Sequence, residues 1–347
     1  MCIMINNKKI GAGQPTYIIA EMSANHNQSL DKAIKIIKAA KSSGADAVKI
    51  QTYTPDTMTI DCSNEYFQIK GTIWEGKNLY KLYQEAFTPW EWQPKLKAVC
   101  DKLSLDFFST PFDATAVNFL ETLNVPAYKI ASFELVDIPL LKKVAGTGKP
   151  IIMSTGMATL AEIDEAVQTI REAGNSEMAL LKCTSAYPAP PEEMNLKTIA
   201  HLANAYNIPV GLSDHTLGSA VAVASVALGG CIIEKHLTLS RSDEGPDSSF
   251  STEPAEFKSL VDDIRIAEKA LGKITYEITE KQQENRVFRR SLFAVKDIEQ
   301  GESFTAENVR SIRPGHGMHT RDYDQILGRK AFKEIKKGTP LRWDLVG

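Results

Sequence analysis

The sequence predicts an α/β protein, a (β/α)8 TIM barrel followed by a small β-rich domain. Two observations predict the barrel. Short β-branched runs alternate with amphipathic segments up to about residue 272. Most of these runs also end in a polar or charged residue, as Glu21 ends YIIAE and His236 ends CIIEKH. A third observation predicts the second domain, because short apolar runs separated by turn residues then replace the alternation.

Eight apolar runs have the length and composition of buried strands. They are expected at 17–22, 46–52, 105–110, 126–131, 150–155, 178–183, 208–213 and 230–236. Eight such units match a (β/α)8 barrel, whose active site lies at the carboxyl ends of the strands. A doubly wound sheet is the alternative, but it would gather its ligand contacts near one switch point. Polar residues at the ends of nearly all the runs favour the barrel.

Helix-start signals follow several of these strands. Ser29 is a plausible N-cap before a segment with apolar residues at helical spacing. Thr159 and Glu162 have the spacing of a capping box after the fifth strand. Thr88 and Glu91 suggest the same start before the helix that precedes the third strand. Each signal places a helix between two predicted strands.

The connection at 53–88 is far longer than an ordinary βα loop of a few residues. A long loop at the carboxyl ends of barrel strands is often functional. Its aromatic residues Trp74, Tyr80 and Tyr83 either form the core of a lid or contact a ligand. The sequence leaves both roles open.

The alternation divides the chain into three parts. Residues 1–272 are the predicted barrel domain, and 273–287 are a charged, exposed linker. Residues 288–347 contain turn signals such as Gln300-Gly301 and Lys337-Gly338 between short apolar runs. We expect a small, irregular β-rich domain there.

Composition excludes several function classes. Forty Lys and Arg against 43 Asp and Glu give a formal net charge of −3, so the whole chain has no electrostatic reason to bind nucleic acid or membranes. The five cysteines are scattered without a metal-binding cluster, which favours a reducing cytoplasm. The N-terminus lacks the features of a secretion signal. The longest weakly polar stretch, SAVAVASVALGGCII, is shorter than the roughly 20 residues that span a bilayer.

Two lysines, Lys49 and Lys129, are expected at strand ends among buried residues. Burying a charged lysine costs free energy of folding unless an anion pairs with it. Hydroxyl residues at equivalent strand ends complete a predicted cradle for phosphate or carboxylate; they are Thr110, Ser132, Ser154 and Ser213. Any one hydroxyl could instead bond to nearby backbone. Either lysine could also be a Schiff-base nucleophile, as in barrel aldolases.

His215 and His236 end consecutive predicted strands, so neighbouring strands would bring their imidazoles together. Such a pair can share a divalent metal ion that keeps positions open for water or substrate and polarises a carbonyl. Glu21 and Glu134 stand at the same rim, where either carboxylate could orient a water or move a proton. Each could equally be a structural hydrogen-bond acceptor or a helix cap.

Two further residues are expected at this rim. Asp247 follows the eighth strand in a loop that can reach over the site, although it could equally be a turn residue after Pro246. Tyr187 follows the sixth strand and could present its hydroxyl to a polyol. Packing against Pro188 is as plausible for Tyr187.

These motifs closely resemble those of the sialic acid synthases, the phosphoenolpyruvate-dependent nonulosonic acid synthases. The matching segments are IIAEMSANHNQSLDKAIKIIKAAKSSGADAVKIQT, STPFD, YKIASFE, STGMA, LKCTSAYP, GLSDHT and IEKHLTL, and the match covers essentially the whole chain. The segments YTPDTMTID and FQIKGTIWEGKNLYKLYQEAFTPWEW are most similar to the pseudaminic acid branch. The terminal domain is similar to the antifreeze-like (SAF, β-clip) domain of these enzymes.

The resemblance implies a transferase that condenses phosphoenolpyruvate with an open-chain amino-sugar aldehyde and releases phosphate. It implies a divalent metal, usually manganese with magnesium or cobalt as alternatives, on His215 and His236. Glu21 would orient the reactants and Glu134 would transfer a proton. The implied phosphoenolpyruvate contacts are Lys49, Thr110, Lys129, Ser132, Ser154 and Ser213, with Lys129 also counted as catalytic. The implied sugar contacts are Gln51, Tyr187 and Asp247.

The family further implies a domain-swapped homodimer. Arg313 in SIRPGHG matches the arginine that the antifreeze-like domain inserts into the neighbouring subunit's active site. Composition alone would make Arg313 an ordinary surface residue.

In the pseudaminic acid branch the sugar would be 2,4-diacetamido-2,4,6-trideoxy-L-altrose, and the product would serve bacterial surface glycan synthesis. The aromatic residues of the 53–88 loop suit a 6-deoxy, diacetamido sugar. Three alternatives remain open. They are an N-acetylneuraminic or legionaminic acid synthase, a Schiff-base lysine aldolase, and a sugar-binding protein without catalytic activity.

Overall fold

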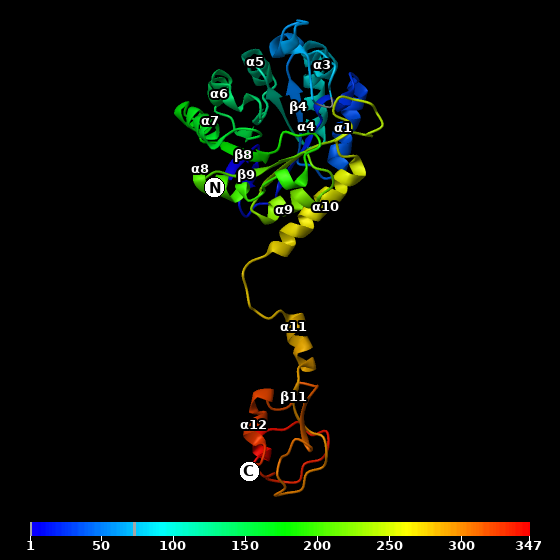
Figure 1. The fold of residues 1–347 in the computed structure, drawn as a ribbon, viewed down its shortest axis with the longest axis vertical. Coiled ribbons are helices and arrows are strands. Elements are labelled where there is room, and N and C mark those ends of the chain that lie inside the picture. Colours follow the sequence, from blue (N-terminus) through cyan, green and yellow to red (C-terminus); the bar gives the residue numbers. More distant parts are fainter. Residues whose placement is uncertain (1, 72–73) are drawn as a thin grey trace. The chain divides into compact units, whose positions relative to one another are not determined.

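The computed structural model describes residues 2–71 and 74–347 (Figure 1). Thr72 and Ile73 of the predicted 53–88 loop therefore lie outside the described residues. The chain forms two compact units, Met1–Gly272 and Lys273–Gly347. In the described ranges, no helix combines the length and the apolar character needed to cross a bilayer.

The first unit is a closed barrel of eight parallel strands in the order β10-β3-β4-β5-β6-β7-β8-β9. This confirms the predicted (β/α)8 fold, and every predicted strand boundary lies within about two residues of the observed one. The barrel strands are β3 (Tyr17–Glu21), β4 (Ala47–Thr52), β5 (Asp106–Pro111), β6 (Tyr128–Ile130), β7 (Ile151–Ser154), β8 (Met178–Cys183), β9 (Val210–Asp214) and β10 (Ile232–His236).

Helices follow the barrel strands and lie around the outside of the barrel (Figure 1). Two short helices, α2 (Pro55–Met58) and α3 (Leu79–Ala86), lie within the 53–88 loop. The outer helices are α1 (Leu30–Ser42), α4 (Gln93–Lys102), α5 (Ala114–Thr122), α6 (Ile138–Ala145), α7 (Leu160–Glu172), α8 (Thr198–Tyr206), α9 (Ala220–Ala227) and α10 (Pro254–Leu271). Single 3₁₀ turns occur at Ser23–His26, Glu65–Phe67, Trp90–Trp92, Glu134–Val136 and Pro191–Glu193.

Two of the three predicted helix starts are confirmed. The Ser29 side chain caps α1, and Thr159 with Glu162 forms a capping box at α7. The start predicted at Thr88 is wrong, because α4 begins at Gln93 without a side-chain cap. The Thr88 hydroxyl lies instead 3.1 Å from Nε2 of His26, so it joins the loop after β3 to the end of the 53–88 loop.

Strand register determines which polar side chains meet inside the barrel. Glu21 of β3 is the Cα partner of both Lys49 in β4 and His236 in β10. Glu234 of β10 is the Cα partner of Ser213 in β9. Because neighbouring Cα partners point to the same face of a sheet, these side chains gather on the inner face of the barrel.

An antiparallel hairpin precedes the barrel and was not predicted. It consists of β1 (Cys2–Ile5) and β2 (Lys8–Gly11). Asp106, the first residue of β5, accepts hydrogen bonds from the Lys8 ammonium at 2.9 Å and from the Tyr17 hydroxyl at 2.7 Å. These contacts place the hairpin at the amino ends of the barrel strands, opposite the predicted site.

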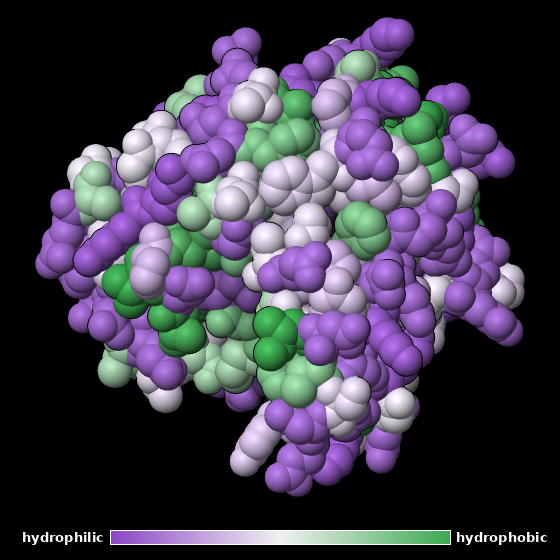
Figure 2. Space-filling view, turned by 90° about the horizontal axis from the view of Figure 1, so that it is seen from above, coloured by the Kyte–Doolittle hydropathy of each residue, from purple (hydrophilic) through white to green (hydrophobic). Residues whose placement is uncertain are grey.

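The buried apolar residues form one core in each unit. The barrel core fills the space inside the strands and between strands and helices, with Ile18, Ile19, Phe107 and Phe108 among its buried members. Figure 2 shows a mostly hydrophilic face on which hydrophobic residues lie in small separate groups. Most large hydrophobic side chains of the barrel unit are buried in this core, where they avoid contact with water.

The second unit has a small core of its own, built around Leu292, Phe304, Val309 and Leu341. Its two-stranded antiparallel sheet and isolated bridges confirm the predicted small β-rich fold. The elements are α11 (Glu280–Asn285), β11 (Ser291–Ala294), β12 (Val309–Ile312), α12 (Tyr323–Ile326), and 3₁₀ turns at Arg286–Phe288, Thr320–Asp322 and Trp343–Leu345.

Candidate active site

A pocket of about 480 Å³ opens at the carboxyl ends of the barrel strands. Its volume lies within the range of about 300–1,000 Å³ that is common for small-molecule sites. The predicted site residues that line it are Lys49, Gln51, Lys129, Ser132, Glu134, Ser154, Tyr187, Ser213, His215, His236 and Asp247. Glu21 and Thr110 are buried and contact Lys49. Arg313 belongs to the second unit, where it is exposed just after β12.

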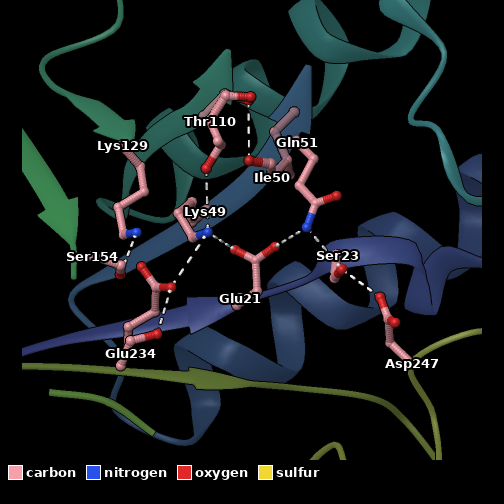
Figure 3. Close-up of polar contacts among 12 residues, drawn as sticks. Glu21, Ser23, Lys49, Ile50, Gln51, Thr110, Lys129, Ser154, Glu234 and Asp247 are labelled. Carbon is pink, nitrogen blue, oxygen red and sulfur yellow. Dashed lines mark hydrogen bonds and ion pairs between the residues drawn. The ribbon is translucent and has the colours of Figure 1, made fainter. Parts of the chain in front are cut away.

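Lys49 is held between two carboxylates (Figure 3). Its Nζ lies 2.7 Å from Oε2 of Glu21 and 3.4 Å from Oε1 of Glu234, and it donates a hydrogen bond of 3.3 Å to the Thr110 hydroxyl. The side chains of the lysine and both glutamates are at most 5% exposed. The protein therefore supplies the anions that a buried lysine requires.

Lys49, Glu21 and Glu234 form a charged triad, and these charges shift one another's pKa values. Burial would lower the pKa of Lys49, but Glu21 and Glu234 outweigh burial and raise it. Burial raises the pKa of Glu21 to about 7, although the attraction of Lys49 opposes that rise. Burial also acts to raise the pKa of Glu234, but Lys129 and Lys49 hold it below its usual value. At neutral pH Lys49 and Glu234 are charged, while Glu21 is about half protonated because its pKa is about 7.

Lys129 has a different environment. Its Nζ donates to the Ser154 hydroxyl at 2.6 Å and to the backbone carbonyl of Ile130 at 2.9 Å. Among the residues that the structure describes, no carboxylate forms an ion pair with it, and the side chain is almost fully buried. Burial lowers its pKa, with partial opposition from Glu234. Lys129 is thus the buried lysine of the pocket that still requires an anion.

The remaining predicted serine hydroxyls belong to the same pocket as Lys129. Ser132 donates to the Cys183 sulfur at 3.5 Å, and Ser213 donates to Glu234 at 3.3 Å. All three serines, Ser132, Ser154 and Ser213, line the pocket. The structure brings the predicted cradle together, with each hydroxyl anchored to a neighbouring side chain.

The two histidines meet at one side of the pocket, with ring centroids 5.4 Å apart. Nδ1 of His215 lies 3.0 Å from the Thr184 carbonyl oxygen, to which it donates, so its Nε2 remains available to a ligand. Nδ1 of His236 is buried without a hydrogen-bond partner in the described part of the chain. Burial, together with the charges of His215 and Lys49, lowers the pKa of His236 well below its usual value. His236 is therefore neutral, which is the form that binds metals.

The acidic residues adjacent to the histidines in sequence have other partners. Asp214 pairs with Lys235 at 2.6 Å, behind the strands, while Glu234 contacts Lys49. The described residues contain no group of three or more His, Cys, Asp or Glu side chains placed to hold a metal ion. The pair His215 and His236 still fits a divalent ion with open positions, because His236 has an orphaned buried nitrogen.

The predicted sugar contacts lie at the outer part of the pocket. The Tyr187 ring packs against His215, with centroids 4.4 Å apart. The Gln51 amide donates to Glu21 at 3.3 Å and to Ser23 at 3.0 Å. The Asp247 carboxylate accepts a hydrogen bond of 2.5 Å from the Ser23 hydroxyl. All three predicted contacts therefore face the same space.

The 53–88 loop contributes an apolar wall to the pocket. Trp74 and Tyr83 line it, and Nε1 of Trp74 donates to the Pro246 carbonyl at 2.9 Å, which joins this loop to the loop that contains Asp247. Of the two roles left open for the loop aromatics, contact with a ligand does not apply to Tyr80. Tyr80 is absent from the pocket lining, and its hydroxyl donates to Asp56 at 3.0 Å outside it.

Glu134 lies in the 3₁₀ turn after β6 and faces the pocket. Its Oε2 is buried and has no hydrogen-bond partner in the described residues. Burial raises the pKa of Glu134 to about 7. A carboxyl group with a pKa near neutrality and a free oxygen is suited to proton transfer.

Glu134→Gln is expected to reduce the pH dependence of stability. The folded protein keeps the Glu134 proton up to about pH 7, whereas the unfolded chain releases it near pH 4.5. Stability therefore falls as pH rises between these values, and the variant lacks this contribution. Urea unfolding from pH 5 to 8 measures the difference, with exposed Glu165→Gln as the control. Equal slopes for Glu134→Gln and the parent would contradict this assignment.

Sequence reasoning missed two residues of the site. Ser23 joins Gln51 to Asp247, and Glu234 completes the Lys49 triad. Glu234 follows the same strand-end rule as the predicted residues, so the rule could have found it.

Comparisons with known proteins agree across the chain. The NeuB family model matches residues 36–276, and the SAF domain model matches residues 289–347. A pseudaminic acid synthase from Helicobacter pylori is 47% identical over 95% of this chain and 98% of its own length. One from Campylobacter jejuni is 48% identical, over 94% of this chain and 95% of the relative.

A more distant relative and a solved structure extend the comparison. The N,N'-diacetyllegionaminic acid synthase of Campylobacter jejuni is 39% identical over 94% of this chain and 99% of the relative. The crystal structure of the spore coat polysaccharide biosynthesis protein SpsE from Bacillus subtilis has a TM-score of 0.68 and 35% identity. That match covers 100% of this chain and 99% of the SpsE chain.

Proposed function

The chain belongs to the NeuB family, and we propose that it is a pseudaminic acid synthase. It would condense phosphoenolpyruvate with 2,4-diacetamido-2,4,6-trideoxy-L-altrose to give pseudaminic acid and phosphate. The observation that supports the reaction class is Lys129, a buried cation without a carboxylate partner in the described residues, in one pocket with the histidine pair. The choice of sugar is supported by identities of 47% and 48% to pseudaminic acid synthases, against 39% to a legionaminic acid synthase.

The phosphoenolpyruvate subsite is proposed around the two lysines. Its phosphate would bind Lys129 with Ser132, Ser154 and Ser213, because Ser154 already contacts the ammonium group and the other two serines line the same pocket. Its carboxylate would lie toward Lys49 and Thr110. Charge-assisted hydrogen bonds of this kind fix an anion firmly and position its carbon 3 for attack on the aldehyde.

The two carboxylates are proposed to have different tasks. Glu21 is held by Lys49 and by the Gln51 amide, so it is placed to orient the reactants. Glu134 has a free oxygen and a pKa of about 7, so it is placed to move the proton of the water that adds at carbon 2. The resulting tetrahedral intermediate then loses phosphate by C–O cleavage.

NeuB-family synthases are generally metal-dependent. We propose that His215 and His236 hold the divalent ion, and manganese is our first choice, with magnesium or cobalt as alternatives. When bound, such an ion polarises the aldehyde oxygen as a Lewis acid. The Tyr187 and Phe250 rings pack on the two histidines and fix their orientation.

Arg313 is proposed to enter the active site of a second subunit in a domain-swapped homodimer. It is exposed after β12, and the pocket residues of the barrel unit do not include it. Arg313→Ala and His236→Ala are each expected to be inactive alone. Refolded together, they should regain about a quarter of parental activity, because half the dimers are mixed and each has one intact site. Lack of recovery in a verified mixed dimer would contradict the swap.

We also propose a cytoplasmic location and a role in bacterial surface glycan synthesis. The five free cysteines suit a reducing compartment, and phosphoenolpyruvate is the proposed substrate. Nucleic acid and membrane are not proposed as partners.

A phosphate-release assay tests the proposed function. The protein is given manganese and phosphoenolpyruvate with one of three sugars: N-acetylmannosamine, 2,4-diacetamido-2,4,6-trideoxymannose or 2,4-diacetamido-2,4,6-trideoxyaltrose. We expect phosphate release with the altrose sugar alone. Preference for either mannose sugar would overturn the assignment, and sugar binding without phosphate release would favour a non-catalytic protein.

A further inference from the structure

We propose that Ser23 is a positioning residue of the sugar subsite. Its hydroxyl holds the Asp247 carboxylate and the Gln51 amide where they receive the sugar aldehyde. This inference rests on the proposed function, because Gln51 and Asp247 are sugar contacts only if the protein is a nonulosonic acid synthase.

The backbone at Ser23 is unusual for a serine. Ser23 begins the 3₁₀ turn after β3 with φ +46°, in the left-handed region that favours glycine. The residue is nonetheless 3% exposed and lines the pocket. A side chain kept at a position better suited to glycine, and directed into a pocket, indicates that the side chain itself has a task.

The Ser23 hydroxyl connects two loops that are far apart in sequence (Figure 3). It donates to Oδ2 of Asp247 at 2.5 Å and accepts from Nε2 of Gln51 at 3.0 Å. A hydroxyl has one donor, and an ionised carboxylate only accepts, so the Ser23 proton is committed to Asp247. The hydroxyl thereby fixes the carboxylate and the amide relative to each other.

This contact determines what Asp247 offers to a ligand. Oδ2 of Asp247 also accepts from the backbone N–H of Ala24 at 3.3 Å. In the part of the chain that the structure describes, Oδ1 of Asp247 takes part in no hydrogen bond. With Oδ2 held from the β3 side, Oδ1 remains to accept from a sugar hydroxyl or amide.

Loss of the hydroxyl should affect the sugar and not phosphoenolpyruvate. Without it, Asp247 keeps the long hydrogen bond from Ala24 as its remaining link to this turn. Lys129 and Ser154, which form the proposed phosphate subsite, have no hydrogen bond to Ser23. The two substrates therefore give separate readouts of the role of Ser23.

Two substitutions separate the hydroxyl from the backbone. Ser23→Ala removes the hydroxyl and keeps Cβ, whereas Ser23→Gly removes the hydroxyl and suits the left-handed backbone. For both we expect kcat/KM for the altrose sugar to fall about 10- to 100-fold, as loss of a charge-assisted hydrogen bond would give. KM for phosphoenolpyruvate should stay within about twofold of the parent, and Ser23→Gly should be at least as thermally stable as Ser23→Ala.

Ser104 provides a matched control. It is also a serine in the left-handed region, with φ +53°, but it is exposed and precedes β5 at the amino ends of the strands. Ser104→Ala and Ser104→Gly make the same chemical changes outside the pocket. Both are expected to keep parental kinetics for both substrates.

Two kinetic outcomes would overturn the inference. One is parental kcat/KM for the sugar in Ser23→Ala, and the other is an equal loss for both substrates, which indicates a general structural defect. Calorimetry of altrose-sugar binding gives a readout that does not need turnover. An unchanged Kd in Ser23→Ala contradicts the inference, while absence of phosphate release from the unaltered protein contradicts the proposed function instead.

Discussion

Lys129→Met is expected to lower kcat/KM for phosphoenolpyruvate by about 10²- to 10³-fold without destabilising the protein. The methionine removes a buried charge that has no carboxylate partner in the described residues, so the free energy of unfolding should rise or stay unchanged. Steady-state phosphate release and urea unfolding measure the two effects. Activity should therefore fall without any loss of stability.

Lys49 and Lys182, two other lysines of the barrel strands, provide the comparison. Lys49→Met leaves Glu21 and Glu234 without their shared cation, so it should be inactive and also destabilised, by about 3–5 kcal/mol. Lys182 is a buried lysine outside the pocket lining, and Lys182→Met should keep parental kinetics. If Lys129→Met keeps the parental kcat/KM for phosphoenolpyruvate, Lys129 does not bind the anion.

The same lysine distinguishes the proposed reaction from a Schiff-base aldolase. Burial lowers the pKa of Lys129, as it would for a Schiff-base lysine. The Lys129 amine is nevertheless engaged by Ser154 and Ile130, and the proposed reaction needs no covalent adduct. Borohydride with pyruvate is expected to leave Lys129 unmodified. A trapped adduct would favour the aldolase.

His236→Gln is expected to abolish phosphate release, a loss of at least about 10³-fold, and to weaken metal binding. The neutral imidazole has a buried nitrogen without a partner in the described residues, and the glutamine amide is a much weaker metal ligand. Manganese binding followed by electron paramagnetic resonance gives a readout independent of turnover. Chelation of the parent protein should give the same loss and be reversed by manganese.

The exposed His201 on α8 supplies the control, and His201→Gln should bind manganese and turn over like the parent. Turnover that persists after thorough removal of metal would contradict a metal-dependent reaction. Loss of activity in His236→Gln with unchanged manganese binding would instead show that His236 has another role.

The barrel and much of the site could be predicted because they depend on local sequence pattern. Each strand is a short, mostly apolar run, and polar residues near its carboxyl end lie at the rim once the barrel closes. Lys129, Ser154 and both histidines follow this rule and line the pocket. The hairpin of β1 and β2 was missed because its strands have four residues each, too few for a clear periodicity.

Other features depend on contacts that sequence does not encode locally. Lys49 was expected to pair with an anion of the ligand. In the barrel, it pairs instead with Glu21 and Glu234, which lie on other strands. The sequence left the role of Tyr80 open, and in the folded chain its hydroxyl donates to Asp56 outside the pocket. Ser23 and Asp247 are 224 positions apart, and their hydrogen bond depends on how two loops meet.

The hairpin at the amino ends of the strands has a kinetic consequence. Because it covers that end of the barrel, substrates must enter from the rim formed by the 53–88 loop and the Asp247 loop. Lys129 is almost fully buried, whereas Trp74 and Asp247, on the two loops of the rim, are partly exposed and so stand nearer the mouth of the pocket. A sugar bound at the mouth would block the way in for phosphoenolpyruvate. We therefore expect compulsory-order addition, with phosphoenolpyruvate binding first and the sugar second.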